Sequence, residues 1–419
     1  MRLIKAPLIY LAKKYPFFKL ARHFYLNVRN WSGRRLYANV KTEPKLVVFE
    51  SYNGRSYSDS PRAIYEAILA DQRFEGFDFV WVFRQTAKYR QSVGSQPRTR
   101  LVRYRSIAYF VAYARAKYWV TNSMIPLEVG KKPDQVLLQT WHGSPLKRLR
   151  NDIVEDTKNA MNSLKDFKRK NDTDTVRYDY MVSPSRFASE AFRSAFDLDR
   201  LGKKDILIET GYPRNDYLFK FKTADVAAIK RELNLPKDKK VLLYAPTWRD
   251  DQHSAAQGYV YKNPTDFDYL RENLGDDWVI LFRAHYMVAN AFDFDKYKGF
   301  IVNASDLDEV NPLYAVADAL MTDYSSVFFD YANLGRPILF YMYDLDHYKD
   351  ELRGFYFDID ELPGDIVKTE TDIVKDLTDL KAYQKRYAKK YTAFNKKFNY
   401  LDDAAAAQRV INQVFKADI

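Results

Sequence analysis

The sequence predicts an α/β protein made of two doubly wound, Rossmann-like halves in tandem, each with a parallel sheet covered by helices on both faces. Short apolar segments typical of buried strands alternate with helical segments from residue 45 onward. A charged helical stretch over residues 219–240 interrupts this alternation, which starts again at residue 241. With 419 residues, the chain has the length of two or three ordinary domains.

The first half is expected to begin with an apolar run that reads KLVVFES and to continue with strands and helices in turn. Each predicted strand is short and nearly continuous in apolar residues, as strands buried on both faces are. Strands are expected over residues 45–51, 77–84, 100–105, 118–122, 135–141, 178–183 and 206–210. Helices are expected over residues 61–70 and 107–116 and from residue 185.

The second half repeats the pattern and ends in a helical tail. Strands are expected over residues 241–245, 278–282, 300–303, 319–322 and 337–343, and helices begin near residues 266, 312 and 326. The tail over residues 369–415 is helical. The predicted organisation is an amino-terminal segment (1–43), a first Rossmann-like domain (44–225), a second Rossmann-like domain (226–385) and a final helix that packs back toward the first domain (386–419).

The composition restricts the class of protein. Lys and Arg number 67 against 55 Asp and Glu, and this net charge of +12 favours an anionic partner such as a phosphate substrate, acidic lipid or nucleic acid. The absence of cysteine excludes disulfides and thiolate metal sites and fits a cytosolic location. No run of 18 apolar residues predicts a membrane-spanning helix, and lysines interrupt the first apolar stretch, unlike a signal peptide.

Residues 1–42 contain ten Lys or Arg and no acidic residue. Apolar residues recur there at helical spacing, and Pro16 separates two such stretches. Two short, basic, aromatic-rich amphipathic helices are typical of a segment that lies in the plane of an anionic membrane surface. The alternative is a pair of helices that pack on the protein's own core and expose a basic face.

The end of one predicted strand carries His142, followed by Gly143 and by Ser144 and Pro145, which are expected to open a helix. A neutral imidazole at this place can remove a proton from an attacking hydroxyl, and free N–H groups of a helix start can face an anion. The alternative is a histidine with a structural hydrogen bond. The predicted substrate-binding residues of this motif are Gly143, Ser144, Pro145 and Leu146.

A second strand end in the other half carries Arg283, Ala284 and His285. Because side chains alternate along a strand, Arg283 and His285 are expected to project to the same side and to clamp a phosphate. The alternative is a surface strand whose charges form salt bridges.

Two further strand ends in the second half offer similar groups. The first provides Pro246, Thr247 and Arg249. The second provides Asp323, Ser325 and Ser326, with Asp330 one helical turn further on. The serines either cap a helix or bind a diphosphate, and Asp330 either accepts hydrogen bonds from ribose hydroxyls or favours the helix dipole.

No tightly bound cofactor or metal is predicted. The sequence has neither a Gly-x-Gly-x-x-Gly motif nor a P-loop. Its carboxylates are not spaced as a metal site, with Asp250 and Asp251 as a weak exception. Soluble Mg²⁺ paired with a nucleotide substrate is compatible with this prediction.

At these residues the chain resembles the CDP-glycerol glycerophosphotransferase family of teichoic acid synthesis. The resemblance covers about residues 100–395 and is carried by ordered blocks such as TWHGSPLKRL, YAPTWRD and MTDYSSVFFDYANLGRPILFY. The matching blocks span residues 140–149, 183–187, 210–216, 244–250, 282–286, 321–341 and 354–364.

The resemblance implies a GT-B fold with the active site between two Rossmann-like domains, an acceptor domain over residues 44–225 and a CDP-donor domain over residues 226–385. It implies transfer of glycerol phosphate or ribitol phosphate from CDP-glycerol or CDP-ribitol to an acceptor linked to undecaprenyl diphosphate, with release of CMP. His142 is then the base and His285 contacts the donor phosphate. The further donor- and substrate-binding residues that it implies are Arg214, Ser325, Ser326 and Asp330.

Such an enzyme is expected to be peripheral, at the cytoplasmic face of the bacterial cell membrane. Polymerising members of the family usually have a longer amino-terminal region, so addition of one unit or of many both stay open, as do glycerol and ribitol. One alternative is a GT-B glycosyltransferase that uses a nucleotide sugar. A basic nucleic-acid-binding protein is the more distant one, because the aromatic residues lie mostly in strand interiors and the basic residues are concentrated at the amino terminus; no nucleic-acid partner is predicted.

Overall fold

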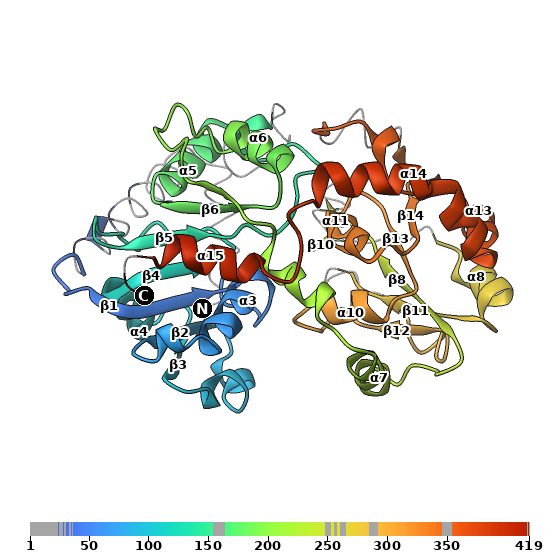
Figure 1. The fold of residues 1–419 in the computed structure, drawn as a ribbon, viewed down its shortest axis with the longest axis horizontal. Coiled ribbons are helices and arrows are strands. Elements are labelled where there is room, and N and C mark those ends of the chain that lie inside the picture. The colour runs from blue at the N-terminus through green and yellow to red at the C-terminus, as the bar shows by residue number, and fades with distance from the viewer. Residues whose placement is uncertain are drawn as a thin grey trace.

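The computed structural model describes residues 24, 28, 31, 32, 35, 37–153, 164–247, 253–254, 258–259, 265–284, 292–345, 354–416 and 418. Within these residues the chain forms two α/β halves that lie side by side, each built on its own sheet (Figure 1). The predicted fold class is therefore confirmed. None of the helices within these ranges has the length and apolar character needed to cross a membrane.

The first half contains a seven-stranded sheet in the order β3-β2-β1-β4-β5-β6-β7, and every neighbouring pair is parallel. The strands are β1 (Glu43–Glu50), β2 (Asp78–Phe83), β3 (Thr99–Arg103), β4 (Ala116–Thr121), β5 (Val136–Gln139), β6 (Tyr180–Ser183) and β7 (Leu207–Glu209). The strand order reverses direction between β1 and β4. Loops that leave the carboxyl ends of strands at such a switch point form ligand sites in open α/β sheets.

The second half contains a six-stranded parallel sheet in the order β12-β11-β8-β13-β14-β15. The strands are β8 (Lys240–Ala245), β11 (Trp278–Phe282), β12 (Ile301–Asn303), β13 (Ala319–Thr322), β14 (Ile338–Tyr341) and β15 (Asp365–Val367), and β9 (His253–Ser254) and β10 (Gly258–Tyr259) form a separate antiparallel pair. Here the switch point lies between β8 and β13.

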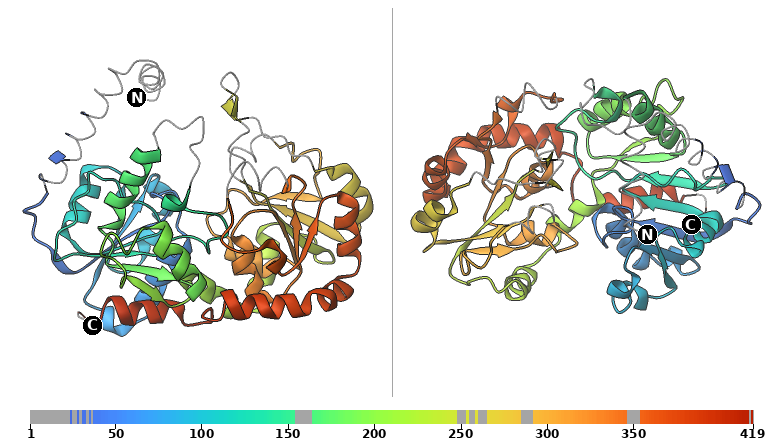
Figure 2. Two further views of the ribbon diagram at one scale, coloured as in Figure 1. Left: turned by 90° about the horizontal axis from the view of Figure 1, so that it is seen from above. Right: turned by 180° about the vertical axis from the view of Figure 1, so that it is seen from behind.

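Helices cover both faces of each sheet (Figures 1 and 2). The α-helices are α3 (Asp59–Leu69), α4 (Ile107–Arg115), α5 (Leu164–Thr175), α6 (Arg186–Ala195), α7 (Thr223–Glu232), α8 (Phe267–Leu274), α10 (Asn311–Val316), α11 (Val327–Tyr331), α13 (Glu370–Thr378), α14 (Leu380–Phe398) and α15 (Ala406–Val414). Short 3₁₀ helices are η1 (Gln72–Phe74), η2 (Thr86–Tyr89), η3 (Val93–Ser95), η4 (Arg150–Asp152), η5 (Pro213–Phe219), η6 (Ala332–Leu334) and η7 (Ile359–Glu361).

The apolar strand runs are buried because both faces of each sheet are covered. Trp81, Trp119 and Trp278 are fully buried on β2, β4 and β11. Each half has one apolar cluster on either face of its sheet. Full burial of a large apolar side chain contributes about 1.5–3 kcal/mol, so these strands fix the two sheets and hold the loops at their carboxyl ends in place.

The chain crosses between the halves twice, at η5 and again between α14 and α15. The carboxyl-terminal helices run along one side of both halves (Figure 2). Val410, Ile411 and Phe415 of this last segment are buried in the core of the first half. Asp216 of the first crossing accepts hydrogen bonds from the backbone of Ala406 and Ala407, which caps the start of α15.

Two of the predicted domain boundaries fall inside α-helices. The boundary predicted between residues 225 and 226 falls inside α7, whose Val226 and Ile229 pack on the core of the second half. The boundary predicted between residues 385 and 386 falls inside α14. The apolar side chains of each of these two helices pack on the second half. The chain therefore passes between the halves in the segments before α7 and after α14, which are not α-helical.

Of residues 1–36 the structure describes only Phe24, Val28, Trp31, Ser32 and Arg35, each of which is helical. The rest of the two predicted amphipathic helices lies outside the described residues.

Candidate active site

A cleft between the two halves lies at the carboxyl ends of both sheets and has two connected chambers. The outer chamber has a volume of about 590 Å³ and the inner one about 840 Å³. Tyr52, His142, Arg283 and Ser326 line both. The predicted site residues that line the outer chamber are His142, Gly143, Ser144, Pro145, Leu146, Pro246, Thr247, Arg283, Ala284, Ser325 and Ser326. Arg214 and Asp330 line the inner chamber.

His142 follows β5 and stands between the chambers, with part of its ring exposed to the cleft. Its Nδ1 lies 2.8 Å from the backbone carbonyl of Asn122. A carbonyl only accepts hydrogen bonds, so Nδ1 carries the proton and Nε2 is left as the basic nitrogen. Desolvation by the surrounding protein lowers the pKa of His142, although the Asn122 carbonyl and the charge of Asp59 act in the opposite direction. The imidazole is therefore neutral near pH 7, as a general base must be.

The residue before His142 has a strained backbone. Trp141 has a φ of 54°, in the left-handed region that bulky side chains rarely adopt. Its ring stacks on the imidazole at a centroid distance of 4.3 Å, and its backbone N–H donates to the side chain of Gln139. This arrangement turns the chain sharply at the end of β5 and aims His142 into the cleft, and strain of this kind is concentrated at functional sites.

The helix predicted to start at Ser144 and Pro145 is absent. The chain is extended from Leu146 to Arg148, because the backbone of these two residues hydrogen-bonds to Tyr356 and Gly354 of the second half. Leu146 packs in the apolar core of the second half. The segment after His142 thus joins the two halves, and no helix start faces the substrate there.

A buried polar network lies behind His142. Asp59 accepts hydrogen bonds from the Asn122 side chain (3.1 Å) and the Tyr52 hydroxyl (2.6 Å). The backbone N–H of Tyr52 in turn donates to the Asn122 side chain at 2.8 Å. Burial alone would raise the pKa of Asp59, but the charge of Arg214 and the hydrogen bonds outweigh it and lower that pKa. Asp59 is therefore a charged anchor for the segment that holds the imidazole.

Arg214 joins this network to the second half. Its guanidinium lies 3.2 Å from Asp59 and 2.9 Å from Asp330, and all three side chains are buried. Asn215 donates to Asp330 at 3.0 Å and to Asp402 at 2.6 Å. In this conformation the charges of Arg214 and Asp330 are directed at each other, so the pair locks the two halves together rather than presenting free groups to a ligand.

The wall formed by the second half consists of loops that are tied to one another by hydrogen bonds between side chains and backbone groups. One nitrogen of Arg283 donates to the carbonyls of Ala304 (3.1 Å) and Leu307 (2.9 Å). Asp323 is buried and accepts hydrogen bonds from the backbone of Thr247 and Tyr324. Asp323 thus fixes the loops after β8 and β13 in relation to each other.

Gly143 lies against the serine loop of the other half. A Cβ atom at this position would lie 2.5 Å from Oγ of Ser326. Any larger residue would push the His142 loop away from the serine loop. The glycine therefore allows the imidazole of one half and the hydroxyls of the other to share one chamber.

His285 and Arg249 lie outside the described residues. Ser326 precedes α11 and makes no side-chain cap hydrogen bond to it. Within the described ranges, no group of three or more His, Asp or Glu side chains is arranged to hold a metal ion.

The sequence analysis did not single out Tyr52, Asn122 or Asp59. Tyr52 and Asn122 follow β1 and β4, the two strands at the switch point of the first sheet. The rule that drew attention to His142, a polar residue just after a buried strand, applies equally to both. Asp59 has no such local signal, because its partners are brought to it only by the fold.

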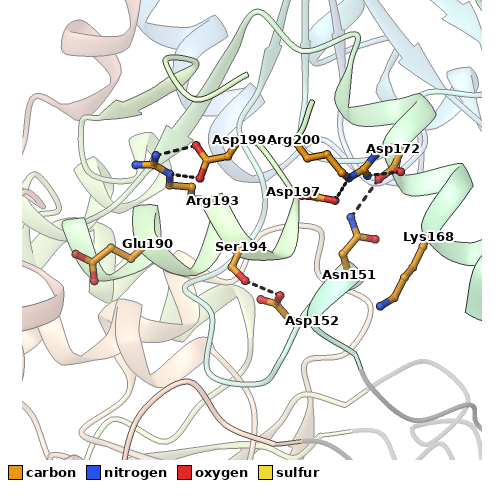
Figure 3. A pocket seen from close by; sticks show the side chains of 10 residues that line it. All are labelled: Asn151, Asp152, Lys168, Asp172, Glu190, Arg193, Ser194, Asp197, Asp199 and Arg200. Carbon is orange, nitrogen blue, oxygen red and sulfur yellow. Dashed lines mark hydrogen bonds and ion pairs between the residues drawn. The ribbon is translucent and has the colours of Figure 1, made fainter. Parts of the chain in front are cut away.

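A separate cavity of about 560 Å³ lies on the first half, between α5 and α6 (Figure 3). Its charged side chains face one another: Arg193 pairs with Asp199, and Arg200 with Asp172 and Asp197. Five of its charged side chains are therefore engaged with one another, and none of the site residues predicted from the sequence lines this cavity.

A match to a known protein family identifies the kind of protein to which this cleft belongs. The sequence pattern of the family described as CDP-Glycerol:Poly(glycerophosphate) glycerophosphotransferase matches residues 34–416. The chain belongs to this family. The resemblance inferred from the sequence blocks is thereby confirmed.

Curated relatives include the teichoic acid poly(glycerol phosphate) polymerase of Staphylococcus epidermidis, 40% identical over 90% of this chain and 51% of the relative. The teichoic acid glycerol-phosphate transferase of Staphylococcus aureus is 40% identical over 88% of this chain and 93% of the relative. The chain spans about half the length of the first of these glycerophosphotransferases and nearly the full length of the second.

The solved structure of the wall teichoic acid polymerase TagF is similar to the structure of this chain, with a TM-score of 0.84 and 38% identity. The match covers 96% of this chain and 97% of the other. A variant of that polymerase soaked with CDPG superposes with a TM-score of 0.83. The GT-B-like arrangement of two Rossmann-like halves is thus confirmed.

Proposed function

We propose that this chain transfers glycerol phosphate from CDP-glycerol to a lipid-linked acceptor and releases CMP, as a step of teichoic acid synthesis. The observation that carries the proposal is the placement of His142. Its Nε2 is the basic nitrogen, and the ring shares a chamber with Arg283, Ser325 and Ser326 of the opposite half. Similarity to glycerol phosphate transferases and polymerases supports the reaction class.

In the proposed reaction an acceptor hydroxyl attacks the donor phosphorus that bears glycerol. The hydroxyl proton passes to Nε2 of His142 while the new P–O bond forms. The bond from that phosphorus to the bridging oxygen breaks, and CMP leaves with the electron pair. Arg283 and the hydroxyls of Ser325 and Ser326 stabilise the negative charge on the diphosphate. His285 and Arg249 are assigned to the same task from the sequence alone.

Glycerol is the proposed polyol because the glycerol phosphate relatives are the more similar ones. The poly(glycerol phosphate) polymerase of Staphylococcus epidermidis is 40% identical over 381 residues. The ribitol-phosphate polymerase TarK of Staphylococcus aureus is 27% identical over 382 residues. Both comparisons cover about nine tenths of this chain, so the difference in identity favours glycerol.

The test of the proposed reaction is a direct assay of donor choice. The protein is incubated with CDP-glycerol, CDP-ribitol or a nucleotide sugar and an undecaprenyl-diphosphate-linked acceptor, and the products are weighed. We expect the acceptor to gain the mass of glycerol phosphate and CMP to be released. Transfer of a sugar without new phosphorus would instead identify a glycosyltransferase.

We also propose that the amino-terminal 43 residues hold the enzyme at the cytoplasmic face of the membrane, where a lipid-linked acceptor lies. Phe24, Val28 and Trp31 are exposed by 71%, 46% and 58%, and their spacing places them on one helical face. An exposed apolar face beside basic residues supports contact with an anionic lipid surface.

Vesicle sedimentation tests this part of the proposal. The full chain should pellet with anionic vesicles and be partly released by salt, whereas a chain that starts at residue 43 should not pellet. Replacement of Phe24, Val28 and Trp31 by Ser in the full chain should weaken binding without removing any charge. Undiminished vesicle binding of the shortened chain would place the membrane contact elsewhere.

A further inference from the structure

The inner chamber of the cleft carries positive charges beyond those of the residues proposed to bind the donor. Its second-half side carries Arg283 and Ser326, which also line the outer chamber. Its first-half side carries Arg55 and Arg84, which line only the inner chamber. The two arginines are therefore on the opposite side of the cleft from the loops assigned to the donor.

A strained turn forms part of the first-half side of the inner chamber. Tyr52, Asn53 and Gly54 follow β1 with φ angles of 47°, 57° and 72°, three consecutive residues in the left-handed region. Two of them are not glycine, so the conformation is costly and is maintained by its surroundings. Arg84 provides part of that support, because its backbone N–H donates to Gly54 and its Nε donates to the carbonyl of Asn53 at 2.8 Å.

The same turn contributes an aromatic side chain, Tyr52, and a guanidinium group, Arg55, to the lining of the chamber. Tyr52 lies beside the imidazole, with a ring centroid distance of 5.9 Å from His142. Arg55 follows three residues later and lines the same chamber as Arg84. A molecule that extends from His142 along the first half would therefore meet both guanidinium groups.

The cations and acids of the chamber differ in how they are paired. Arg214 is held between Asp59 and Asp330. On the opposite wall Asp308 pairs with Lys88, and Glu309 accepts the backbone N–H of Asp59.

By contrast, neither Arg55 nor Arg84 has an ion pair with a carboxylate among the residues that the structure describes. Asp306 is the acid of the chamber lining that stays exposed. The two exposed guanidinium groups on the first-half wall thus remain available to an anion.

We infer that the inner chamber binds the acceptor, and that Arg55 and Arg84 hold its phosphodiester group while its terminal hydroxyl reaches His142. This inference rests on the proposed transfer reaction. If the donor occupies the outer chamber, the acceptor must approach Nε2 of His142 from the other side, which is the inner chamber. Guanidinium groups bind phosphate oxygens through paired, charge-assisted hydrogen bonds.

The test compares two acceptors, a short soluble oligo(glycerol phosphate) and free glycerol, with CDP-glycerol as the donor. The ratio of their kcat/KM values measures how much the enzyme gains from the acceptor phosphate. Arg55→Ala and Arg84→Ala should each reduce this ratio about 10-fold, and the double variant should reduce it further. Arg→Lys at each position should retain part of it, because lysine keeps the charge but loses the paired geometry.

Arg186→Ala is the matched control, since Arg186 is exposed on α6 outside both chambers and pairs with Glu190. It should leave the ratio unchanged. An unchanged ratio in the Arg55 and Arg84 double variant would overturn the inference. So would a parallel loss of CDP-glycerol affinity, because the arginines would then serve the donor.

Calorimetry separates a failure of this inference from a failure of the proposed function. If the native enzyme transfers to neither acceptor, the proposed reaction is wrong, yet the chamber can still be tested by titration with oligo(glycerol phosphate). Weaker binding to the double variant than to Arg186→Ala supports the site. Equal binding to both variants refutes it.

Discussion

The two walls of the cleft are built in different ways. On the first half, the imidazole of His142, the proposed base, is backed by a buried network of side chains that runs from Asn122 through Asp59 to Arg214. On the second half, Arg283 and the serines lie on loops that are joined to one another by hydrogen bonds from single side chains to the backbone.

This difference follows from the task proposed for each wall. A general base acts only if one nitrogen is unprotonated and faces the substrate, so its tautomer and orientation must be fixed. Binding of a diphosphate requires several donors that converge, and backbone-anchored loops place them without a single dominant contact. The first wall is therefore expected to be sensitive to single substitutions and the second to lose function gradually.

The largest effect is expected for His142→Ala. Loss of the base should lower kcat roughly 10²- to 10⁴-fold, while CDP-glycerol affinity stays near its original value because the proposed donor contacts belong to the other wall. Steady-state kinetics and calorimetry measure the two quantities. A variant with near-native turnover would contradict the assignment of His142 as the base.

Arg214→Met removes the cation shared by both halves. Asp59 and Asp330 would then be buried without a counter-charge, and the loss of one partner from a buried ion pair costs about 3–5 kcal/mol. Urea unfolding should show this decrease in the free energy of unfolding. Arg186→Ala, which breaks an exposed pair, should change stability by less than about 1 kcal/mol. Similar values for both variants would mean that the buried pair does not lock the halves.

Ser325→Ala and Ser326→Ala test whether donor binding by the second wall weakens in steps as single hydroxyls are removed. Each hydroxyl contributes one hydrogen bond to the diphosphate, so each variant should weaken CDP-glycerol binding about 3- to 10-fold, and the double variant should lose roughly the product. Titration calorimetry measures the affinity. Unchanged donor affinity in the double variant would remove the serines from the donor site.

The smallest effect is a shift in the pH profile. A base works in its neutral form, so kcat should fall as the pH decreases through the pKa of His142, which desolvation holds below its usual 6.5. The charge of Asp59 raises that pKa, so Asp59→Asn should move the acid limb to still lower pH. An acid limb that moves to higher pH in this variant would contradict the electrostatic coupling between the two residues.

Much of the cleft was predictable from local sequence. The apolar runs of β11 and β13 match the predicted ranges to the residue, because a parallel strand buried on both faces needs an uninterrupted apolar segment. The rule that ligands bind beyond the carboxyl ends of such strands then placed His142, Arg283 and Ser326 in one cleft. No long-range information was required for either step.

The sequence alone determined the two sheets, the strand-end motifs and, through their resemblance, the family of this protein. Only the tertiary structure decided that Arg214 is held between Asp59 and Asp330, that Gly143 touches the serine loop and that the segment after Pro145 is extended. The reason is that periodicity and propensity report on neighbours along the chain. Asp59 and Arg214 are 155 positions apart, and their contact exists only because two separately specified halves are brought together.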